Sequence, residues 1–297
     1  MYVSRCFATD RETARAQFVA ACDAAGLPVA AYHPPSEIAT SAEPVVEVTR
    51  IGAAGAATAV ALTCGAWEDE GLCASGIQTA LLRENVSARL PRDTALVLVH
   101  AIAPIGLSGL DRGRSAAWNV RSGRQWTHAA LAAAENRFAS YVQESVPNPA
   151  APGQRSVPWQ ARLLCRIADD FFAAAERIAL IDLRTGAGAY GDSEVAPCHT
   201  ASDPSLRRAA ALFGIHSSDA EAPTRGTPGD LASGLIAALD RSDVAAAVLE
   251  FGTYSMRSVL APGSGRIFYP DSPDWREQVL RRTLAVIWQA LSHQDRR

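Results

Sequence analysis

The chain has 297 residues, a formal net charge of −3 and 48% hydrophobic residues, which is ordinary composition for a globular protein with a large core. A slightly acidic chain lacks the basic face that nucleic-acid binding normally requires, so no nucleic-acid partner is expected. No apolar run is long enough to span a bilayer, so no membrane partner is expected either. The first residues become polar at once and show no apolar core of a secretory signal. We therefore expect a cytoplasmic protein.

The six cysteines give the same indication about the compartment. They lie at positions 6, 22, 64, 73, 165 and 198, and no two of them form a C-x-x-C pair. In a chain of this length without a secretory signal, this spacing predicts reduced and mostly buried thiols.

The first elements are a helix and two strands. Apolar residues recur at helical spacing over residues 10–26, with Asp10 as the expected N-cap and Gly26 as the stop. An extended segment follows as far as Tyr32. Residues 45–51 and 57–63 read as strands that a short turn separates.

The next stretch predicts a helix, a buried strand and a second helix. An amphipathic pattern over residues 71–90 indicates a long helix that Pro91 ends. Residues 94–102 are nearly all apolar, as in a strand that is buried on both faces. Residues 127–146 have helical periodicity, and the Pro-rich residues 146–157 are typical of a surface loop.

The remaining elements alternate in the same way. Helices are expected at residues 158–176, 203–213, 229–240 and 274–291, strands at 177–183 and 244–251, and a long polar loop at 217–229. Apolar strands that alternate with helices predict an α/β fold with a twisted, mixed and mostly parallel sheet covered by helices on both faces. We find no domain boundary, so we expect a single domain over residues 1–297.

Two patterns have a structural reading that outweighs the functional one. The glycine-rich stretch at residues 186–191 matches G-x-G-x-x-G after a strand, but the helix that a dinucleotide site needs does not follow, so a turn loop is favoured. No two of the six histidines lie at metal-ligand spacing. His100 ends an apolar strand, where a hydrogen-bonded core histidine is favoured over a ligand.

Polar residues end three of the expected strands, at residues 63–70, 182–185 and 250–253. In an open parallel sheet, ligands bind beyond the carboxyl ends of the strands. Glu250 follows an apolar strand and should be largely removed from water, which is costly for a carboxylate without a partner. It is either half of a structural ion pair with an arginine or a base in a pocket.

These strand ends resemble the zinc carboxypeptidase superfamily, and most closely a bacterial branch of cytosolic single-domain proteins. The T-S-G-x-H-G-x-E-G pattern of that branch corresponds to residues 63–71, H-A-I-N-P-x-G to 100–106 and D-L-H-T-G-x-G-x-Y-G to 182–191. The L-E-F-G-T pattern is intact at residues 249–253. The N-x-x-x-N-R pattern corresponds to residues 119–124 after a two-residue insertion.

The resemblance implies roles for individual residues. Glu70 is in the position of a metal ligand and Glu250 in that of the general base, while Trp67 and Arg184 occupy the positions of the two ligand histidines. The resemblance also implies that Arg124, or Arg121 if the insertion shifts the register, binds a substrate carboxylate. Further substrate contacts are implied for Asn119, Trp67, Tyr190 and Thr253.

The two replacements predict the loss of the metal. A single carboxylate is too few ligands for a catalytic zinc ion, an indole has no lone pair for a metal, and a guanidinium repels a cation. We expect Arg184 to supply the missing positive charge between Glu70 and Glu250, with no metal and no cofactor. An oxygen-rich metal site rebuilt around Glu68 and Asp69 is the less favoured alternative.

Three functions remain open at this point. The first is a metal-independent enzyme that acts by acid/base chemistry, such as hydrolysis, cyclisation or elimination, on a small amino-acid-like or peptide-like carboxylate. In this hypothesis Glu250, Arg184 and Glu70 form the catalytic set. The second is a catalytically inactive binding or regulatory protein, and the third is a metallopeptidase with a rebuilt site. The sequence does not discriminate among oligomeric states.

Overall fold

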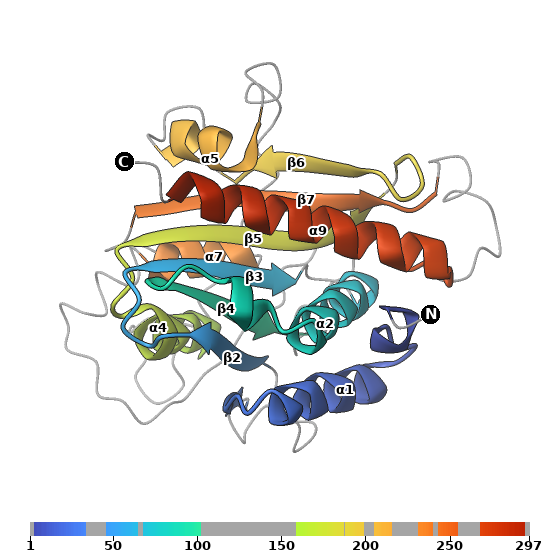
Figure 1. Cartoon of the computed structure of the whole chain (residues 1–297), viewed down its shortest axis with the longest axis horizontal. Helices are drawn as coiled ribbons and strands as arrows, with labels where there is room; N and C mark the ends of the chain where they lie inside the picture. Colours follow the sequence, from blue (N-terminus) through green and yellow to red (C-terminus); the bar gives the residue numbers. More distant parts are fainter. Residues whose placement is uncertain are drawn as a thin grey trace, which may run out of the picture.

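Seven strands from across the chain form one mixed sheet in the order β1-β2-β4-β3-β5-β7-β6 (Figure 1). The structure is a computed structural model, and it describes residues 3–33, 46–64, 68–101, 159–186, 188–198, 205–215, 231–239, 243–254 and 268–294. The helix expected at residues 127–146 and the loops expected at 146–157 and 217–229 lie outside these residues.

The centre of the sheet consists of the four strands that the sequence predicted to be buried. They are β3 (Thr58–Cys64), β4 (Thr94–His100), β5 (Arg177–Gly186) and β7 (Asp243–Gly252). Neighbouring strands in the order β4-β3-β5-β7 are parallel. Every residue of β3 and β4 is buried, because helices cover both faces of the sheet. The prediction of an α/β fold with a mostly parallel centre is confirmed.

Antiparallel strands form the two margins of the sheet. On one side, β2 (Val46–Gly52) pairs with β4 and β1 (Val29–Tyr32) pairs with β2. On the other side, β6 (Ser193–Pro197) pairs with β7. Only an extended segment was expected at β1, and no strand at β6. The residues of β6 alternate poorly between polar and apolar, and Pro197 is tolerated because β6 is an edge strand.

Helices lie on both sides of this sheet. In Figure 1, α9 (Pro273–Gln294) crosses the near face, with α2 (Glu68–Arg83) and α1 (Arg11–Ala24) beside it, while α7 (Leu231–Ala238) lies behind. The remaining described helices are α4 (Trp159–Phe172), α5 (Ser205–Phe213) and two short 3-10 helices, η1 (Val3–Cys6) and η2 (Val86–Arg89). No described helix has the length and apolarity needed to cross a membrane.

The ends of two helices differ from the sequence prediction. The α1 helix begins as expected, because the Asp10 carboxylate accepts a hydrogen bond of 2.8 Å from the Thr13 amide. In contrast, α2 does not run to Pro91. It ends at Arg83, and Asn85 adopts a left-handed conformation with φ 51° before η2, which interrupts the helix. The α4 helix also ends earlier than expected, at Phe172 rather than Glu176.

A large apolar core joins the sheet to its helices. Trp275 of α9 is fully buried, and its indole Nε1 donates a hydrogen bond of 2.9 Å to the carbonyl oxygen of Gly252, at the end of β7. All six cysteines are free thiols, and Cys6, Cys22, Cys64 and Cys73 are buried. The expectation of reduced and mostly buried thiols is confirmed. The core therefore holds α9 against the carboxyl end of β7, where the candidate site lies.

Candidate functional site

The carboxyl ends of the parallel strands bring together side chains from three of them. Thr63 on β3 pairs in register with Asp182 on β5. Two residues further along β5, Arg184 pairs in register with Glu250 on β7. This is the edge of an open parallel sheet at which ligands bind. Whether these side chains are functional stays a prediction.

Arg184 and Glu250 are direct partners across the β5–β7 ladder. Partner residues on adjacent parallel strands are about 4.8 Å apart, and their side chains leave the same face of the sheet. The Arg184 side chain is 14% exposed, and Glu250 is half-buried rather than largely removed from water as the sequence suggested. A cation and a carboxylate therefore stand side by side near the carboxyl ends of β5 and β7.

Asp182 is a site residue that the sequence reasoning missed. Its side chain is 1% exposed, and Oδ2 accepts a hydrogen bond of 2.7 Å from Arg184 Nε in an ion pair. The other oxygen, Oδ1, accepts a hydrogen bond of 2.6 Å from the Thr63 hydroxyl. Residues two apart in a strand share a face, so the order Asp-Leu-Arg in the sequence could have predicted that Asp182 and Arg184 pair. The pairing fixes the direction of the guanidinium.

Glu70 lies in the first turn of α2 and is 7% exposed. Burial is the main cause that raises the pKa of the Cys73 thiol, and the charge of Glu70 raises it further. Burial likewise raises the pKa of the Cys64 thiol, followed by the charge of Asp182 and, more weakly, that of Glu70. At this position the amino terminus of α2 favours the negative charge of Glu70.

Cys64 is not positioned as a nucleophile, although it lies next to Thr63. Its side chain is buried, and the thiol donates a hydrogen bond to the carbonyl oxygen of Ala101. The raised pKa keeps the thiol protonated, whereas nucleophilic cysteines have a lowered pKa and partial exposure.

Glu250 extends over the backbone of Gly186 at the end of β5. A Cβ atom at Gly186 would lie 2.8 Å from Cδ of Glu250, which is closer than side-chain atoms tolerate. The absence of a side chain at Gly186 therefore makes the space in which the Glu250 carboxyl group lies.

The loop after Gly186 is held against the end of β7 by backbone hydrogen bonds. Thr253 donates to the Gly186 carbonyl oxygen twice, from its amide at 3.0 Å and from its hydroxyl at 2.9 Å. Gly191, with φ 71°, donates to the Gly252 carbonyl oxygen at 3.0 Å. The strand β6 follows instead of a helix, so the glycine-rich stretch is a turn loop, as expected. The buried Thr253 braces this loop, and its implied contact with substrate stays a prediction.

Tyr190 lies in the same loop and is 44% exposed, and its ring is 5.8 Å from that of Tyr254, measured between centroids. Trp67, Asn119, Arg121 and Arg124 lie outside the described residues, as do the side chains of Glu68 and Asp69. Their implied roles stay predictions. The register of β5 and β7 pairs Arg184 with Glu250, but a side-chain hydrogen bond from Arg184 to Glu70 or Glu250 stays a prediction.

The fit of a zinc ion can be judged from the donors present. Among the residues that the structure describes, no three His, Cys, Asp or Glu side chains come together as metal ligands. At the strand ends, the guanidinium of Arg184 stands beside Glu250 and is bonded to Asp182. A fixed cation in that position opposes a divalent ion. The described donor set therefore does not fit zinc, and no step below involves a metal.

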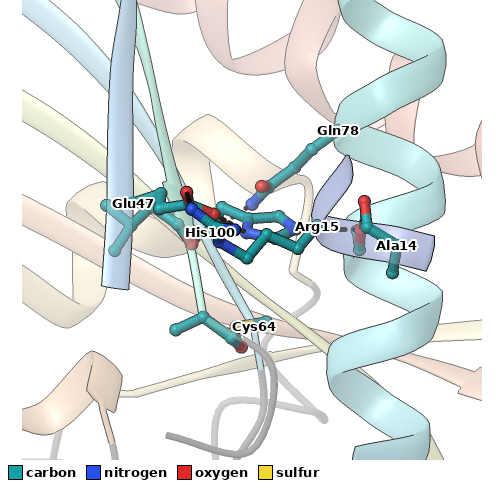
Figure 2. Close-up of polar contacts among 9 residues, drawn as sticks. Ala14, Arg15, Glu47, Cys64, Gln78 and His100 are labelled. Carbon is teal, nitrogen blue, oxygen red and sulfur yellow. Dashed lines mark hydrogen bonds and ion pairs between the residues drawn. The ribbon is translucent and has the colours of Figure 1, made fainter. Parts of the chain in front are cut away.

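A second polar cluster lies between α1, α2 and the β2–β4 pair (Figure 2). His100 Nδ1 is 3.4 Å from Glu47 Oε2, and His100 Nε2 is 2.9 Å from Ser75 Oγ. Arg15 Nη2 pairs with Glu47 Oε1 at 3.0 Å, and the ring of Phe18 stacks on His100 at 4.1 Å. Because a carboxylate can only accept, Nδ1 carries the proton and Nε2 accepts from the Ser75 hydroxyl.

This cluster has the connectivity of a Ser-His-acid triad but not its accessibility. Ser75 is 2% exposed, His100 4% and Glu47 3%, so no substrate carbonyl can approach the serine. The cluster joins α1 and α2 to the sheet. The expectation that His100 is a hydrogen-bonded core residue is confirmed.

Comparison with known proteins places the chain in a family. A family model described as "Protein of unknown function (DUF2817)" matches residues 7–143 and 143–265. The chain belongs to that family. No curated protein matches it.

Solved structures agree on the fold of this family member. Carboxypeptidase A from Helicoverpa armigera aligns with a TM-score of 0.54 and 12% identity, over 95% of this chain and 73% of that one. Bovine thrombin-activatable fibrinolysis inhibitor, solved with a tick carboxypeptidase inhibitor, aligns with a TM-score of 0.51 and 9% identity, over 99% and 98% of the two chains. The fold is similar to that of these two proteins, so the carboxypeptidase-like fold that the sequence predicted is confirmed.

Proposed function

We propose that this protein is a metal-independent enzyme on a carboxypeptidase-like fold, acting on a small amino-acid-like or peptide-like carboxylate by acid/base chemistry. The observation that carries the proposal is the pairing of Arg184 with Glu250 across β5 and β7, at the ligand-binding edge of the sheet. A carboxylate that is partly removed from water is a common proton-transfer group, and the cation beside it can stabilise negative charge that develops on a substrate.

In a hydrolytic reaction, Glu250 would take a proton from a water molecule as the water oxygen attacks the substrate carbonyl carbon. Arg184, held in direction by Asp182, would stabilise the negative charge that develops on the carbonyl oxygen. Breakage of the C–N bond would then be completed when Glu250 returns the proton to the leaving nitrogen. Cyclisation differs in that an amine of the substrate replaces water as the nucleophile.

The anchor for the substrate carboxylate in this proposal is Arg124, with Arg121 as the alternative, because a planar guanidinium pairs with a carboxylate through two hydrogen bonds. Replacing the anchor by alanine should weaken ligand binding by about 2–4 kcal/mol if the pair is desolvated. Loss of affinity in Arg121→Ala alone would show that Arg121 is the anchor.

The test is a mass-spectrometric screen of N-acyl amino acids and dipeptides with the wild-type protein and Glu250→Gln. The amide has the shape of the carboxylate but cannot take up the proton, so turnover should fall by at least a hundredfold while the thermal unfolding curve is retained. Full activity in Glu250→Gln would rule out the role of this residue.

A second candidate is a binding protein that uses the same site without turnover. One observation favours it: Asp182 already pairs with Arg184 and Thr63, so these buried groups satisfy one another before any ligand binds. This candidate would be supported over the enzyme if a compound of the screen bound without forming a product and bound equally well to Glu250→Gln.

A further inference from the structure

Two tyrosines stand in contact with solvent on the segments that follow β5 and β7. Tyr190 is 44% exposed and Tyr254 37%, and within the described ranges these are the large hydrophobic side chains that the solvent reaches most. Their ring centroids are 5.8 Å apart and the rings are inclined by 48°. Rings stacked face to face would cover one another, whereas this inclination leaves ring faces open.

The backbone that bears the two rings is firmly held. The Gly188 amide donates to the Tyr254 carbonyl oxygen at 3.3 Å, and the Gly252 amide donates to the backbone carbonyl oxygen of Asp192 at 2.9 Å. From α9, Arg282 pairs with the Asp192 carboxylate at 2.8 Å and donates to the Gly191 carbonyl oxygen at 3.0 Å. The backbone from which the rings extend is therefore fixed before any ligand arrives, which lowers the entropy cost of binding to them.

Both rings are close in the chain to the proposed base. Tyr254 lies two residues beyond the end of β7 and four residues after Glu250. Tyr190 follows Gly186, over which Glu250 lies, by four residues. Exposed aromatic side chains that adjoin a polar site are characteristic of binding surfaces, since one face is apolar and the hydroxyl remains hydrated.

We infer that Tyr190 and Tyr254 form an aromatic subsite that binds the aromatic side chain of the ligand whose polar group reaches Glu250. The inference rests on the proposed function and adds a substrate preference to it: an aromatic amino-acid-like molecule over one with a small or a cationic side chain. An aromatic ring placed against two inclined tyrosines gains edge and face contacts with both.

The experiment measures binding rather than turnover, by isothermal titration of N-acetyl-phenylalanine, N-acetyl-alanine and N-acetyl-lysine, which share one carboxylate. Wild-type protein should bind the phenylalanine probe roughly tenfold more tightly than the alanine probe. The double variant Tyr190→Ala with Tyr254→Ala should lose this preference. The matched control, Tyr190→Phe with Tyr254→Phe, retains both rings and should keep it.

Each other outcome overturns the inference. Equal affinity for the phenylalanine and alanine probes, or no detectable binding of any probe, would show that the rings make no subsite. A preference for the lysine probe would show a cation site instead. A change of oligomeric state in the alanine double variant, seen by analytical ultracentrifugation, would show an interface between copies of the chain.

Failure of the proposed function gives a different result. If Glu250→Gln keeps full turnover but the phenylalanine preference stands, the assignment of the base fails and the subsite remains. If Glu250→Gln is inactive but the preference is absent, the subsite fails and the assignment of the base remains.

Discussion

Gly186 and Glu250 are in contact at the ends of β5 and β7, and the contact depends on the missing side chain of the glycine. A Cβ atom at Gly186 would lie 2.8 Å from Cδ of Glu250 and 3.2 Å from its Cγ. The space beside the proposed base is thus fixed by a residue that has no chemistry of its own.

Gly186→Ala should therefore displace the Glu250 carboxyl group without unfolding the protein. The end of a glutamate side chain can rotate away at a cost of about 0.5–1.5 kcal/mol, so we expect a small loss of stability and a crystal structure with Glu250 in another rotamer. The matched control is Gly55→Ala, since a Cβ atom at Gly55 would meet nothing within 4 Å. An unmoved Glu250 in the Gly186→Ala structure would contradict the prediction.

The ion pair between Asp182 and Arg184 should contribute measurably to stability, because both side chains are largely buried. Removing one partner of a buried pair costs about 3–5 kcal/mol, and the partial exposure of Arg184 puts Arg184→Gln near the lower end. Asp182→Asn with Arg184→Gln should lose less than the sum of the single losses, by roughly 1–3 kcal/mol. Urea unfolding of the four proteins measures this coupling.

The exposed pair Arg166–Asp170 is the control for this cycle. Its side chains are 71% and 46% exposed, so Arg166→Gln should change the free energy of unfolding by less than about 1 kcal/mol. Additive losses at Asp182 and Arg184 would show that the two side chains do not stabilise one another.

The sequence was sufficient for the centre of the sheet and for β2, and insufficient for β1 and β6. Strands β3, β4, β5 and β7 were predictable because each is an unbroken apolar run that requires cover on both faces. The edge strand β6 was not, since its pairing with β7 depends on a turn of glycines rather than on its own pattern. The early end of α2 depends on the left-handed Asn85, which periodicity does not reveal.

The candidate site shows the same division. Strand ends and motif resemblance predicted that Glu250, Arg184 and Glu70 would lie together. The structure pairs Arg184 with Glu250 in register, and the place of Glu70 beside them stays a prediction. Neither the strand ends nor the resemblance indicated that Arg184 would pair with Asp182, because the choice of partner depends on side-chain direction across β5 and on the Thr63 hydroxyl. Sequence reasoning considered Glu70 and Glu250 as partners of Arg184 and overlooked Asp182, which is two residues away and forms an ion pair with it.

The buried cluster at His100 predicts a loss of stability in mild acid. Burial lowers the pKa of the His100 imidazole, an effect that the hydrogen bond to Glu47 opposes and the charges of Arg15 and Arg11 reinforce. The unfolded chain therefore binds a proton more readily than the folded one. The stability that the neutral His100 gives the folded protein is fully present above the pKa of the unfolded chain, about 6.5. It is lost as the pH falls through the lower pKa of the folded protein.

Urea unfolding between pH 7.5 and 5 should show this loss, with a slope of up to about 1.4 kcal/mol per pH unit from this one group. His100→Gln should be less stable at pH 7.5 because it loses the stacking with Phe18, but its stability should depend less on pH. His33 is exposed, so His33→Gln is the matched control and should behave as the wild type. An equally steep slope in His100→Gln would show that other groups cause the loss.

The metal prediction follows from the charges at the strand ends. We expect the purified protein to hold no stoichiometric zinc, because Arg184 places a permanent cation beside Glu250 and the sequence places Trp67 at the other ligand position. Trp67→His combined with Arg184→His should give zinc binding in calorimetry and elemental analysis, since two imidazoles and Glu70 supply the three ligands of a catalytic site. Asp182, which now accepts a hydrogen bond from Arg184, could then accept one from the imidazole introduced there and orient it.

Either single change should fail to give zinc binding, because the remaining indole or guanidinium still blocks the ion. One zinc per wild-type chain that survives mild chelation would contradict the metal-free reading and favour a site rebuilt around Glu68 and Asp69.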